Sequence, residues 1–256
     1  MTLARWAAEL TEVACHAGAE ILKIYEGDFV TNRKADQSPV TAADLAAEAV
    51  ILPALRRLAP DILIISEEDS HQSGLPAQAP ERFWLVDPLD GTKEFVARNG
   101  EFTVNIALIE HGRPVLGIVH VPVLGQTYRG YATTAEYAVD GQSFKRIQAR
   151  ATPAEGATLI ISRSHAAKEP VQAEQFGERV GGTIVAGSSV KFCRIAEGVA
   201  DLYPRLGPTM EWDTAAGHAV LEAAGGSVRT LEGETLAYGK SGFRNPHFVA
   251  RGLRRG

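Results

Sequence analysis

Cysteine is scarce in this sequence: Cys15 and Cys193 are the only two, and each lies in an apolar helical pattern. Two isolated thiols provide neither a disulfide framework nor the spacing of a zinc site, so we expect both to be small buried hydrophobic residues. No apolar run approaches the ~20 residues that a membrane helix needs, and residues 1–10 lack the apolar core of a signal peptide. We therefore expect a cytoplasmic protein without an integral membrane segment.

An excess of basic charge is also missing. The net charge is −5 at pH 7 and the sequence pI is near 5.8, whereas proteins that bind nucleic acid polymers through phosphates are usually basic. A small phosphorylated molecule remains a suitable ligand if metal ions or local cations neutralise it. With 256 residues, of which 45% are hydrophobic and 22% charged, the chain can form one large domain or two fused lobes with an ample core.

Hydrophobic spacing in the first half predicts two helices followed by strands. Apolar residues at helical spacing predict a helix over residues 3–25, and Thr41 is a candidate N-cap for a second helix that ends near Leu58. Short apolar runs, separated by polar residues, are typical of buried strands, and Pro88 is expected to end the second of them. We predict a loop over residues 70–80 and strands over residues 62–65, 83–86, 102–109, 114–121, 128–131 and 136–139.

Strands alternate with helices after residue 151, which favours a second lobe with a more parallel sheet. We predict helices over residues 171–180, 189–199 and 213–224, and strands over residues 158–161, 183–186, 201–203 and 227–230. The predicted class is α/β (α+β). An N-terminal α+β lobe, residues 1–150, carries the antiparallel meander, and a C-terminal α/β lobe, residues 151–256, follows it.

The most informative segment is Asp87-Pro88-Leu89-Asp90-Gly91, which follows an apolar strand. Open α/β sheets usually place ligands at such a strand end. Pro88 stiffens the connection between the two aspartates, and Gly91 permits close approach of the backbone to a ligand. Carboxylates held close together repel one another, whereas a hard divalent cation such as Mg²⁺ prefers oxygen ligands, including the carbonyl of Leu89.

Two further acidic positions lie at the ends of predicted elements, one after a strand and one at the start of a helix. Glu67 follows the strand over residues 62–65, and Asp213 opens the helix over residues 213–224. All three acidic segments have simpler interpretations. Glu67 could lie in a solvated loop, and Asp213 could be a helix N-cap. The Asp-Pro-Leu-Asp-Gly string could be a plain turn. Three acidic groups that each lie at one end of a predicted element nevertheless favour a shared metal site.

These residues belong to segments that resemble the inositol monophosphatase-like superfamily of Mg²⁺-dependent, Li⁺-sensitive phosphatases, and within it the bacterial 3′(2′),5′-bisphosphate nucleotidases. The resemblance runs nearly from end to end and includes the string WLVDPLDGTKEF. It implies a layered αβαβα sandwich with the site between two lobes. The segments that carry it are residues 34–44, 66–69, 84–95, 99–108, 161–165, 187–193, 203–209 and 212–217.

The resemblance implies how the acidic residues divide between metal ions. Glu67, Asp87 and the carbonyl of Leu89 would hold one Mg²⁺, and Asp87, Asp90 and Asp213 a second, with a third and weaker ion near Glu67. The nucleophile would be a metal-activated water. Three residues would have catalytic roles: Glu67, and Thr92 supported by Asp44, which would orient that water or accept its proton. Asp44 has an alternative role in capping the helix after Thr41.

The resemblance also implies a set of substrate-binding residues. Arg205 is the most telling, because inositol monophosphatases usually carry an acidic side chain near this position, and a cation suits a second phosphate better. Surface positions on a helix or loop are the alternative for Lys191 and His165. Lys34 lies on a loop that closes over the metals in the family. The full set is Lys34, Glu67, Asp87, Leu89, Asp90, Gly91, Thr92, Ser162, His165, Ser188, Lys191, Arg205 and Asp213.

The implied reaction is removal of the 3′-phosphate from adenosine 3′,5′-bisphosphate, giving AMP and phosphate, with 3′-phosphoadenylyl sulfate as a second substrate and a role in sulfur metabolism. An inositol-1-monophosphatase is the nearest alternative, and a non-catalytic nucleotide-binding protein is an alternative of another class. A fructose 1,6-bisphosphatase is disfavoured by the segment that follows Thr92. The family contains monomers and homodimers, and some members associate peripherally with the inner membrane.

Overall fold

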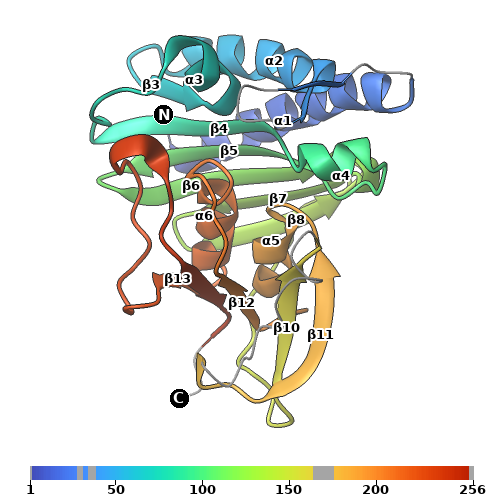
Figure 1. Ribbon diagram of the computed structural model, residues 1–256, viewed down its shortest axis with the longest axis vertical. Helices are drawn as coiled ribbons and strands as arrows, with labels where there is room; N and C mark the ends of the chain where they lie inside the picture. The colour runs from blue at the N-terminus through green and yellow to red at the C-terminus, as the bar shows by residue number, and fades with distance from the viewer. Residues whose placement is uncertain (1, 28–30, 34–38, 164–175, 254–256) are drawn as a thin grey trace.

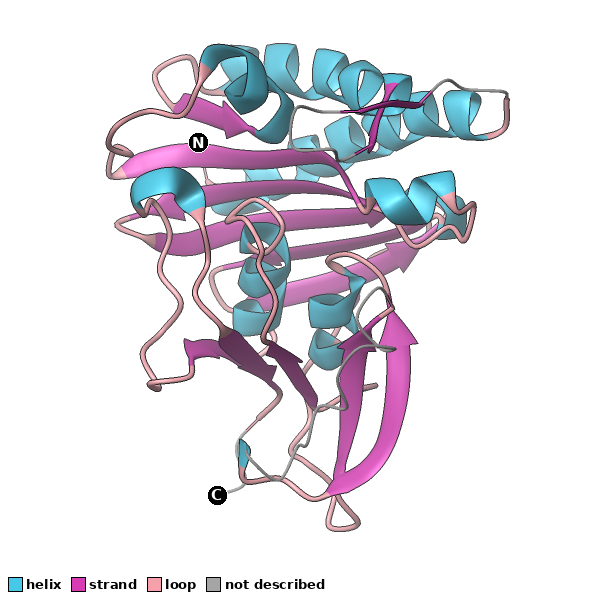
Figure 2. Cartoon of the chain, in the orientation of Figure 1, coloured by secondary structure: helices cyan, strands magenta, loops and turns pink. Residues whose placement is uncertain are grey.

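The computed structural model describes residues 2–27, 31–33, 39–163 and 176–253 (Figure 1). Within these ranges two sheets and two layers of helices alternate, and Figure 2 shows the same arrangement by type of element. The chain thus has the predicted mixed α/β fold. None of the helices in this part of the chain combines the length and apolar character needed to cross a membrane.

Two long helices cover the outer face of the larger sheet (Figure 1). They are α1 (Leu3–Tyr25) and α2 (Ala42–Leu58), and both predicted helices are confirmed. The first helix begins after Thr2, whose side-chain oxygen accepts a hydrogen bond from the Arg5 N–H at 3.3 Å. Apolar residues recur every three to four positions on its buried face: Trp6, Ala7, Leu10, Ala14, Ala17 and Ile21.

The larger sheet has seven strands in the order β3-β4-β5-β6-β7-β8-β9, which is also their order in the sequence. Only the first pair, β3 and β4, is parallel, and the remaining strands form the predicted antiparallel meander. The bounds are β3 (Leu63–Ser66), β4 (Arg82–Asp90), β5 (Thr103–Glu110), β6 (Arg113–Val121), β7 (Gln126–Tyr131), β8 (Thr134–Val139) and β9 (Lys145–Arg146).

Strand β4 corrects one prediction, because it continues through Pro88 to Asp90. The register with β5 shifts between Asp87 and Asp90, so a bulge lies at the proline. A bulge removes residues from the regular hydrogen-bond ladder, and a residue without an N–H is tolerated there. The bulge also sets the directions of the two flanking aspartates independently of the regular two-residue alternation.

Short elements surround the larger sheet. The expected loop over residues 70–80 is wrong at its start, since helix α3 (Glu67–Ser73) follows β3 directly. Helix α4 (Thr92–Val96) follows Gly91, whose φ of 94° is open to glycine at little cost. The others are strands β1 (Thr31–Arg33) and β2 (Pro39–Thr41) and the 3₁₀ turns η1 (Pro122–Leu124) and η3 (Ser241–Phe243).

Helices α5 (Val190–Ala196) and α6 (Ala215–Ala223) lie between the two sheets (Figure 1). Glycines on the larger sheet allow α6 to approach closely. A Cβ at Gly117 would lie 2.3 Å from the Ala216 carbonyl oxygen, and one at Gly130 would lie 2.4 Å from the Val220 Cα. The sheet and the helix that leads out of the acidic site therefore pack backbone against backbone.

The smaller sheet has five strands in the order β11-β10-β12-β14-β13. Strand β10 is parallel to β11 and β12, as predicted, whereas β14, which the sequence did not indicate, is antiparallel to β12 and β13. The bounds are β10 (Ala157–Ser162), β11 (Val180–Ala186), β12 (Leu202–Arg205), β13 (Ser227–Thr230) and β14 (Phe248–Arg251).

The described residues form four layers of the expected αβαβα sandwich. The sequence also predicts a helix over residues 171–180. Its residues 171–175 lie outside the described part of the chain, and its end is wrong because Val180 begins β11. Cys193 is buried as expected, whereas Cys15 is half-buried. The lobe boundary near residue 150 stays a prediction.

Candidate active site

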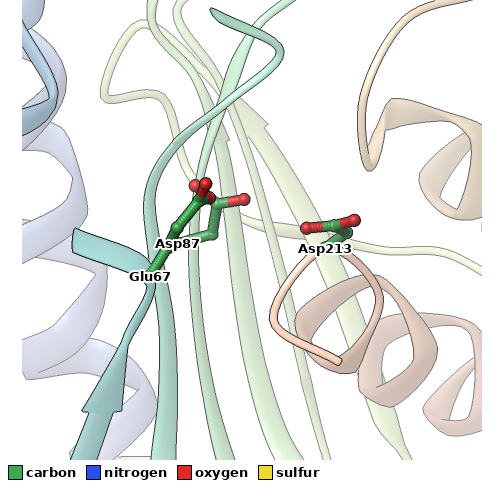
Figure 3. A group of neighbouring side chains, drawn as sticks. All are labelled: Glu67, Asp87 and Asp213. Atoms are coloured by element: carbon green, nitrogen blue, oxygen red, sulfur yellow. The ribbon is translucent and has the colours of Figure 1, made fainter. Parts of the chain in front are cut away.

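Three of the predicted acidic residues meet between the two sheets (Figure 3). One carboxylate oxygen from each of Glu67, Asp87 and Asp213 lies within 4.8 Å of the other two. Figure 3 shows the Glu67 and Asp87 side chains next to each other, with Asp213 facing them from the loop before α6. The structure therefore brings together residues that are far apart in the sequence.

Strand pairing explains why Glu67 reaches Asp87. Strands β3 and β4 are parallel, and Ser66 at the end of β3 pairs with Val86 on β4. The next residue in each case is an acid, Glu67 at the start of α3 and Asp87 on β4, so the two carboxylates lie at the same edge of the sheet. This is the carboxyl edge of the parallel pair, as the sequence predicted for Glu67.

Asp213 reaches the cluster from the other side of the cleft. It precedes α6, which begins at Ala215, so it is not the N-cap that the sequence offered as an alternative; that position belongs to Thr214. Its Oδ2 accepts a hydrogen bond from the Met210 N–H at 2.9 Å. Its main-chain carbonyl accepts one from the Ser189 hydroxyl at 2.7 Å. Both bonds fix the turn that presents the carboxylate.

Asp90 and Leu89 lie beside the group of three. Asp90 Oδ2 is 3.5 Å from both Thr103 Oγ1 and Asn105 Nδ2, which are potential donors on β5. The buried Leu89 donates its N–H to Asp87 Oδ1 at 3.1 Å, which fixes the rotation of that carboxylate. The ligand roles of the Leu89 carbonyl and of Asp90 stay predictions.

Burial and mutual repulsion perturb these acids. The pKa of Asp87 is raised well above its usual range by burial, and further by the charges of Glu67, Asp90 and Asp213. Burial, together with Asp90 and Glu67, likewise raises the pKa of Asp213 well above its usual range. The pKa of Asp90 is raised to about 6, mainly by burial and against the opposing effect of Lys191. Ionising the whole cluster is therefore costly without a cation.

The donor set fits a hard divalent cation. All three close oxygens come from carboxylates, the ligands that Mg²⁺ and Ca²⁺ prefer, whereas softer metals favour cysteine and histidine. A cation among them would remove the repulsion that raises their pKa values. The residues present thus match the metal requirement that the sequence implies.

Thr92 and Asp44 lie at the starts of two different helices. Thr92 is the first residue of α4, directly after Gly91. Asp44 lies in the first turn of α2, is 2% exposed, and contributes to the raised pKa of Asp87. Asp44 is thus close enough to act electrostatically on the site, while the water-orienting role of the pair stays a prediction.

A cavity of about 100 Å³ next to the acidic cluster gathers most of the predicted substrate residues. Lys191 on α5 and Arg205 at the end of β12 supply its positive charge. Burial lowers the pKa of Lys191 to about 8, while the nearby Asp90 favours its charged form. Arg205 also donates from Nη2 to the Pro208 carbonyl at 3.0 Å. The lining includes Asp90, Gly91, Ser162, Ser188, Lys191, Arg205 and Asp213.

Glu67 and Asp213 also line a larger cleft of about 830 Å³. Lys93, Arg244 and His247 line it together with Trp212. The acidic cluster therefore lies where a small and a large depression meet. Of the remaining predicted residues, Lys34 and His165 lie outside the described part of the chain.

Three polar residues join the site that sequence reasoning did not assign to it. Asn105 donates from Nδ2 to Ser189 Oγ at 3.0 Å, and the hydroxyl oxygens of Thr103 and Ser188 lie 2.9 Å apart. Asn105, Thr103 and Ser189 are all buried. One signal was available for Asn105, because it is the only polar residue in the otherwise apolar run over residues 104–109.

Comparisons with known proteins agree with both the fold and the acidic cluster. Residues 3–252 match the model of the inositol monophosphatase family. The chain belongs to this family.

Relatives within the family share most of the chain. It is 49% identical over 253 residues to the 3′(2′),5′-bisphosphate nucleotidase CysQ of Salmonella typhimurium, covering 94% of this chain and 97% of the relative. It is 48% identical over 251 residues to CysQ of Escherichia coli K12, with the same coverage. The crystal structure of CysQ from Bacteroides thetaiotaomicron superposes with a TM-score of 0.78 at 36% identity, covering 97% of each chain.

Proposed function

We propose that this chain is a Mg²⁺-dependent phosphomonoesterase that removes the 3′-phosphate of adenosine 3′,5′-bisphosphate, giving AMP and phosphate. One observation carries the proposal: the Glu67, Asp87 and Asp213 oxygens lie within 4.8 Å of one another beside a cavity that Lys191 and Arg205 line. The first feature suits a phosphoryl group held by cations, and the second suits a further phosphate on the same molecule. The names of the similar CysQ proteins support the same substrate.

The acidic residues would hold two Mg²⁺ ions. Glu67, Asp87 and the Leu89 carbonyl would bind one; Asp87, Asp90 and Asp213 would bind the other, and a third, weaker ion would lie near Glu67. When bound, Mg²⁺ supplies charge stabilisation for the phosphoryl group and lowers the pKa of water. The protein contributes the fixed positions of these ligands, because Leu89 and Met210 N–H groups hold Asp87 and Asp213 in place.

The remaining residues orient the reactants. In the reaction, a water oxygen bonds to phosphorus, the bond from phosphorus to the 3′ oxygen breaks, and the released alcohol takes up a proton. Thr92, supported by Asp44, would orient the water and take part in moving its proton. Alignment of water, phosphorus and leaving oxygen provides much of the rate enhancement of phosphoryl transfer.

Substrate choice would depend on the cations in the small cavity. Arg205 presents a planar guanidinium that suits bidentate binding of phosphate. Lys191 keeps most of its positive charge at pH 7, since burial lowers its pKa only to about 8. Ser162 and Ser188 add hydroxyl groups at the same wall. These residues would bind the 5′-phosphate, which inositol phosphates with a single phosphate lack. The sulfated relative 3′-phosphoadenylyl sulfate would present its anionic group to the same wall.

A paired assay tests the proposal. Phosphate release is measured from adenosine 3′,5′-bisphosphate and from inositol 1-phosphate, each with Mg²⁺ and with EDTA. We expect Mg²⁺-dependent release with kcat/KM at least tenfold higher for the nucleotide. Faster release from inositol 1-phosphate would make the chain an inositol monophosphatase, and tight nucleotide binding without release would make it a binding protein.

A further inference from the structure

Glu101 links the two sheets through a single carboxylate. It lies between α4 and β5 on the side of the larger sheet. Arg163, just after β10, donates from Nε at 2.9 Å and from Nη2 at 2.6 Å to the two carboxylate oxygens. The N–H of Gly187, just after β11, donates to Glu101 Oε2 at 2.8 Å. One side chain thus holds the ends of two neighbouring parallel strands of the smaller sheet.

The backbones on the two sides are in direct contact at this point. A Cβ at Gly187 would lie 2.8 Å from the Glu101 carbonyl oxygen, which is too close for any larger residue. A Cβ at Gly91, in the acidic loop, would lie 3.3 Å from both that oxygen and the Ser188 Cβ. The spacing between the acidic loop and residues 187–188 is therefore set by contact, and Glu101 lies at the junction.

Ser188 adopts a conformation that requires support. Its φ is 40°, a left-handed value that serine rarely adopts. Such a residue persists only where its surroundings hold it. Its hydroxyl oxygen lies 2.9 Å from Thr103 Oγ1, and its carbonyl accepts a hydrogen bond from Lys191 Nζ. Since Gly187 directly precedes it, the bond from Gly187 to Glu101 completes this support.

We propose that Glu101 is a positioning residue, which holds residues 187–191 against the larger sheet so that Ser188 and Lys191 face the second phosphate of the substrate. The identity of that substrate rests on the proposed function. Glu101 acts through Gly187 and Ser188, because the Ser188 carbonyl in turn fixes the Lys191 ammonium at the wall of the small cavity.

The acidic cluster has an anchor of its own. Ser189 holds the Asp213 main chain, and Asn105 on β5 holds Ser189. Loss of the Glu101 carboxylate should therefore leave the metal ligands in place while Ser188 and Lys191 lose their fixed position. The expected signature is a rise in KM with little change in kcat, which differs from the effect of a general loss of stability.

Glu110 provides a matched control. It ends β5, whereas Glu101 closely precedes that strand, and it pairs with Arg82 Nε at 2.9 Å. The two glutamate side chains are similarly exposed, at 34% for Glu110 and 25% for Glu101. The variants are Glu101→Gln, Glu110→Gln, Arg163→Met and the double variant Glu101→Gln/Arg163→Met.

Each variant is assayed with adenosine 3′,5′-bisphosphate at saturating Mg²⁺, and amide hydrogen exchange is followed in peptides covering residues 183–192. For Glu101→Gln we expect a KM about tenfold higher, as for loss of a charge-assisted pair, with kcat within about threefold of wild type. Exchange of residues 187–191 should be about tenfold faster, since local opening becomes easier. Glu110→Gln should match wild type, and Glu101→Gln should add little in the Arg163→Met background.

Wild-type exchange at residues 187–191 together with a wild-type KM in Glu101→Gln would overturn the proposal. A fall in kcat as large as the rise in KM, with faster exchange along the whole chain, would also overturn the proposal, because these changes indicate general destabilisation. If the wild-type protein does not hydrolyse the bisphosphate, the proposed function fails. The local exchange then decides by itself whether Glu101 holds residues 187–191.

Discussion

The Ser189 hydroxyl donates a hydrogen bond to the main-chain carbonyl oxygen of Asp213 at 2.7 Å. Ser189 accepts in turn from Asn105 Nδ2 at 3.0 Å. Asn105 and Ser189 are each 1% exposed, so water competes little for the bond between them. Hydrogen bonds therefore connect the larger sheet, through the residue before α5, to the main chain of Asp213, whose carboxylate faces Glu67 and Asp87.

Ser189→Ala should weaken metal binding more than it weakens the fold. The change removes the bond to Asp213 and leaves the Asn105 amide with only the longer contact to Asp90 Oδ2 at 3.5 Å, at a cost of about 1–3 kcal/mol in unfolding free energy. We expect the Mg²⁺ concentration for half-maximal activity to rise several-fold while activity recovers at high Mg²⁺. Mg²⁺ titrations of activity measure this, with the exposed Ser143→Ala as control. An unchanged Mg²⁺ requirement would show that Ser189 does not position Asp213.

Asp87→Asn should abolish turnover and yet stabilise the metal-free protein. The folded-state pKa of Asp87 is raised above its unfolded value, so ionisation of this group at pH 7 to 8 lowers stability. A neutral amide removes that cost, and we expect a higher Tm than that of the wild type in EDTA. Mg²⁺ should raise the Tm of the wild type but not that of the variant.

Thermal unfolding with EDTA and with Mg²⁺ tests this prediction, with Asp61→Asn as an exposed control. A lower Tm for Asp87→Asn than for wild type in EDTA would mean that the cluster is not strained by its own charge.

Arg205→Glu should separate substrates with two phosphates from those with one. It places a negative charge at the wall of the small cavity, next to Lys191. We expect kcat/KM for adenosine 3′,5′-bisphosphate to fall about 100-fold, as for truncation of a charge-assisted phosphate contact plus new repulsion. For 3′-AMP the loss should be under about tenfold. Equal losses on both substrates would remove Arg205 from recognition of the second phosphate.

Two buried histidines should make the fold sensitive to acid. Burial lowers the pKa of His120, which is hydrogen-bonded to Thr127 at 2.8 Å, to about 4. Burial, with a smaller effect from Arg113, lowers the pKa of His218 to about 3. His218 is therefore neutral at pH 7, and its 3.7 Å approach to Glu222 is not an ion pair there.

Below pH 6.5 both histidines bind protons in the unfolded chain but not in the folded chain. Each histidine should thus cost about 2 kcal/mol of unfolding free energy between pH 7 and pH 5. Denaturant unfolding of wild type, His120→Gln and His218→Gln in EDTA measures this. The raised pKa values of the acidic cluster act in the opposite direction, and the difference between wild type and variant isolates the histidine. Identical pH slopes for all three proteins would contradict the prediction.

Local patterns in the sequence predicted much of the fold. Apolar periodicity and a candidate cap predicted α1 and α2, and apolar runs bounded by polar residues predicted most strands of both sheets. The same reasoning placed Glu67 and Asp87 at one sheet edge, because each acid directly follows a buried run. Their proximity then follows from the parallel pairing of β3 and β4.

Features that depend on tertiary structure were not predictable in this way. Pro88 predicts the end of a strand, yet β4 continues through it because the bulge needs no N–H there. The three acidic residues after Ser66 are typical of a solvated loop. In the structure, their negative charges suit the first turn of α3. The pairing of Glu101 with Arg163 joins residues 62 positions apart, and no local pattern indicates it.

A crystal soaked with Mn²⁺, which can replace Mg²⁺ at oxygen ligands, tests the central claim most directly. The metal is located by its anomalous scattering at the acidic cluster. We predict at least one peak within about 2.0–2.3 Å of carboxylate oxygens of Asp87 and of Glu67 or Asp213. Crystals that bind Mn²⁺ elsewhere but show no peak among these three side chains would contradict a metal-dependent phosphatase site here.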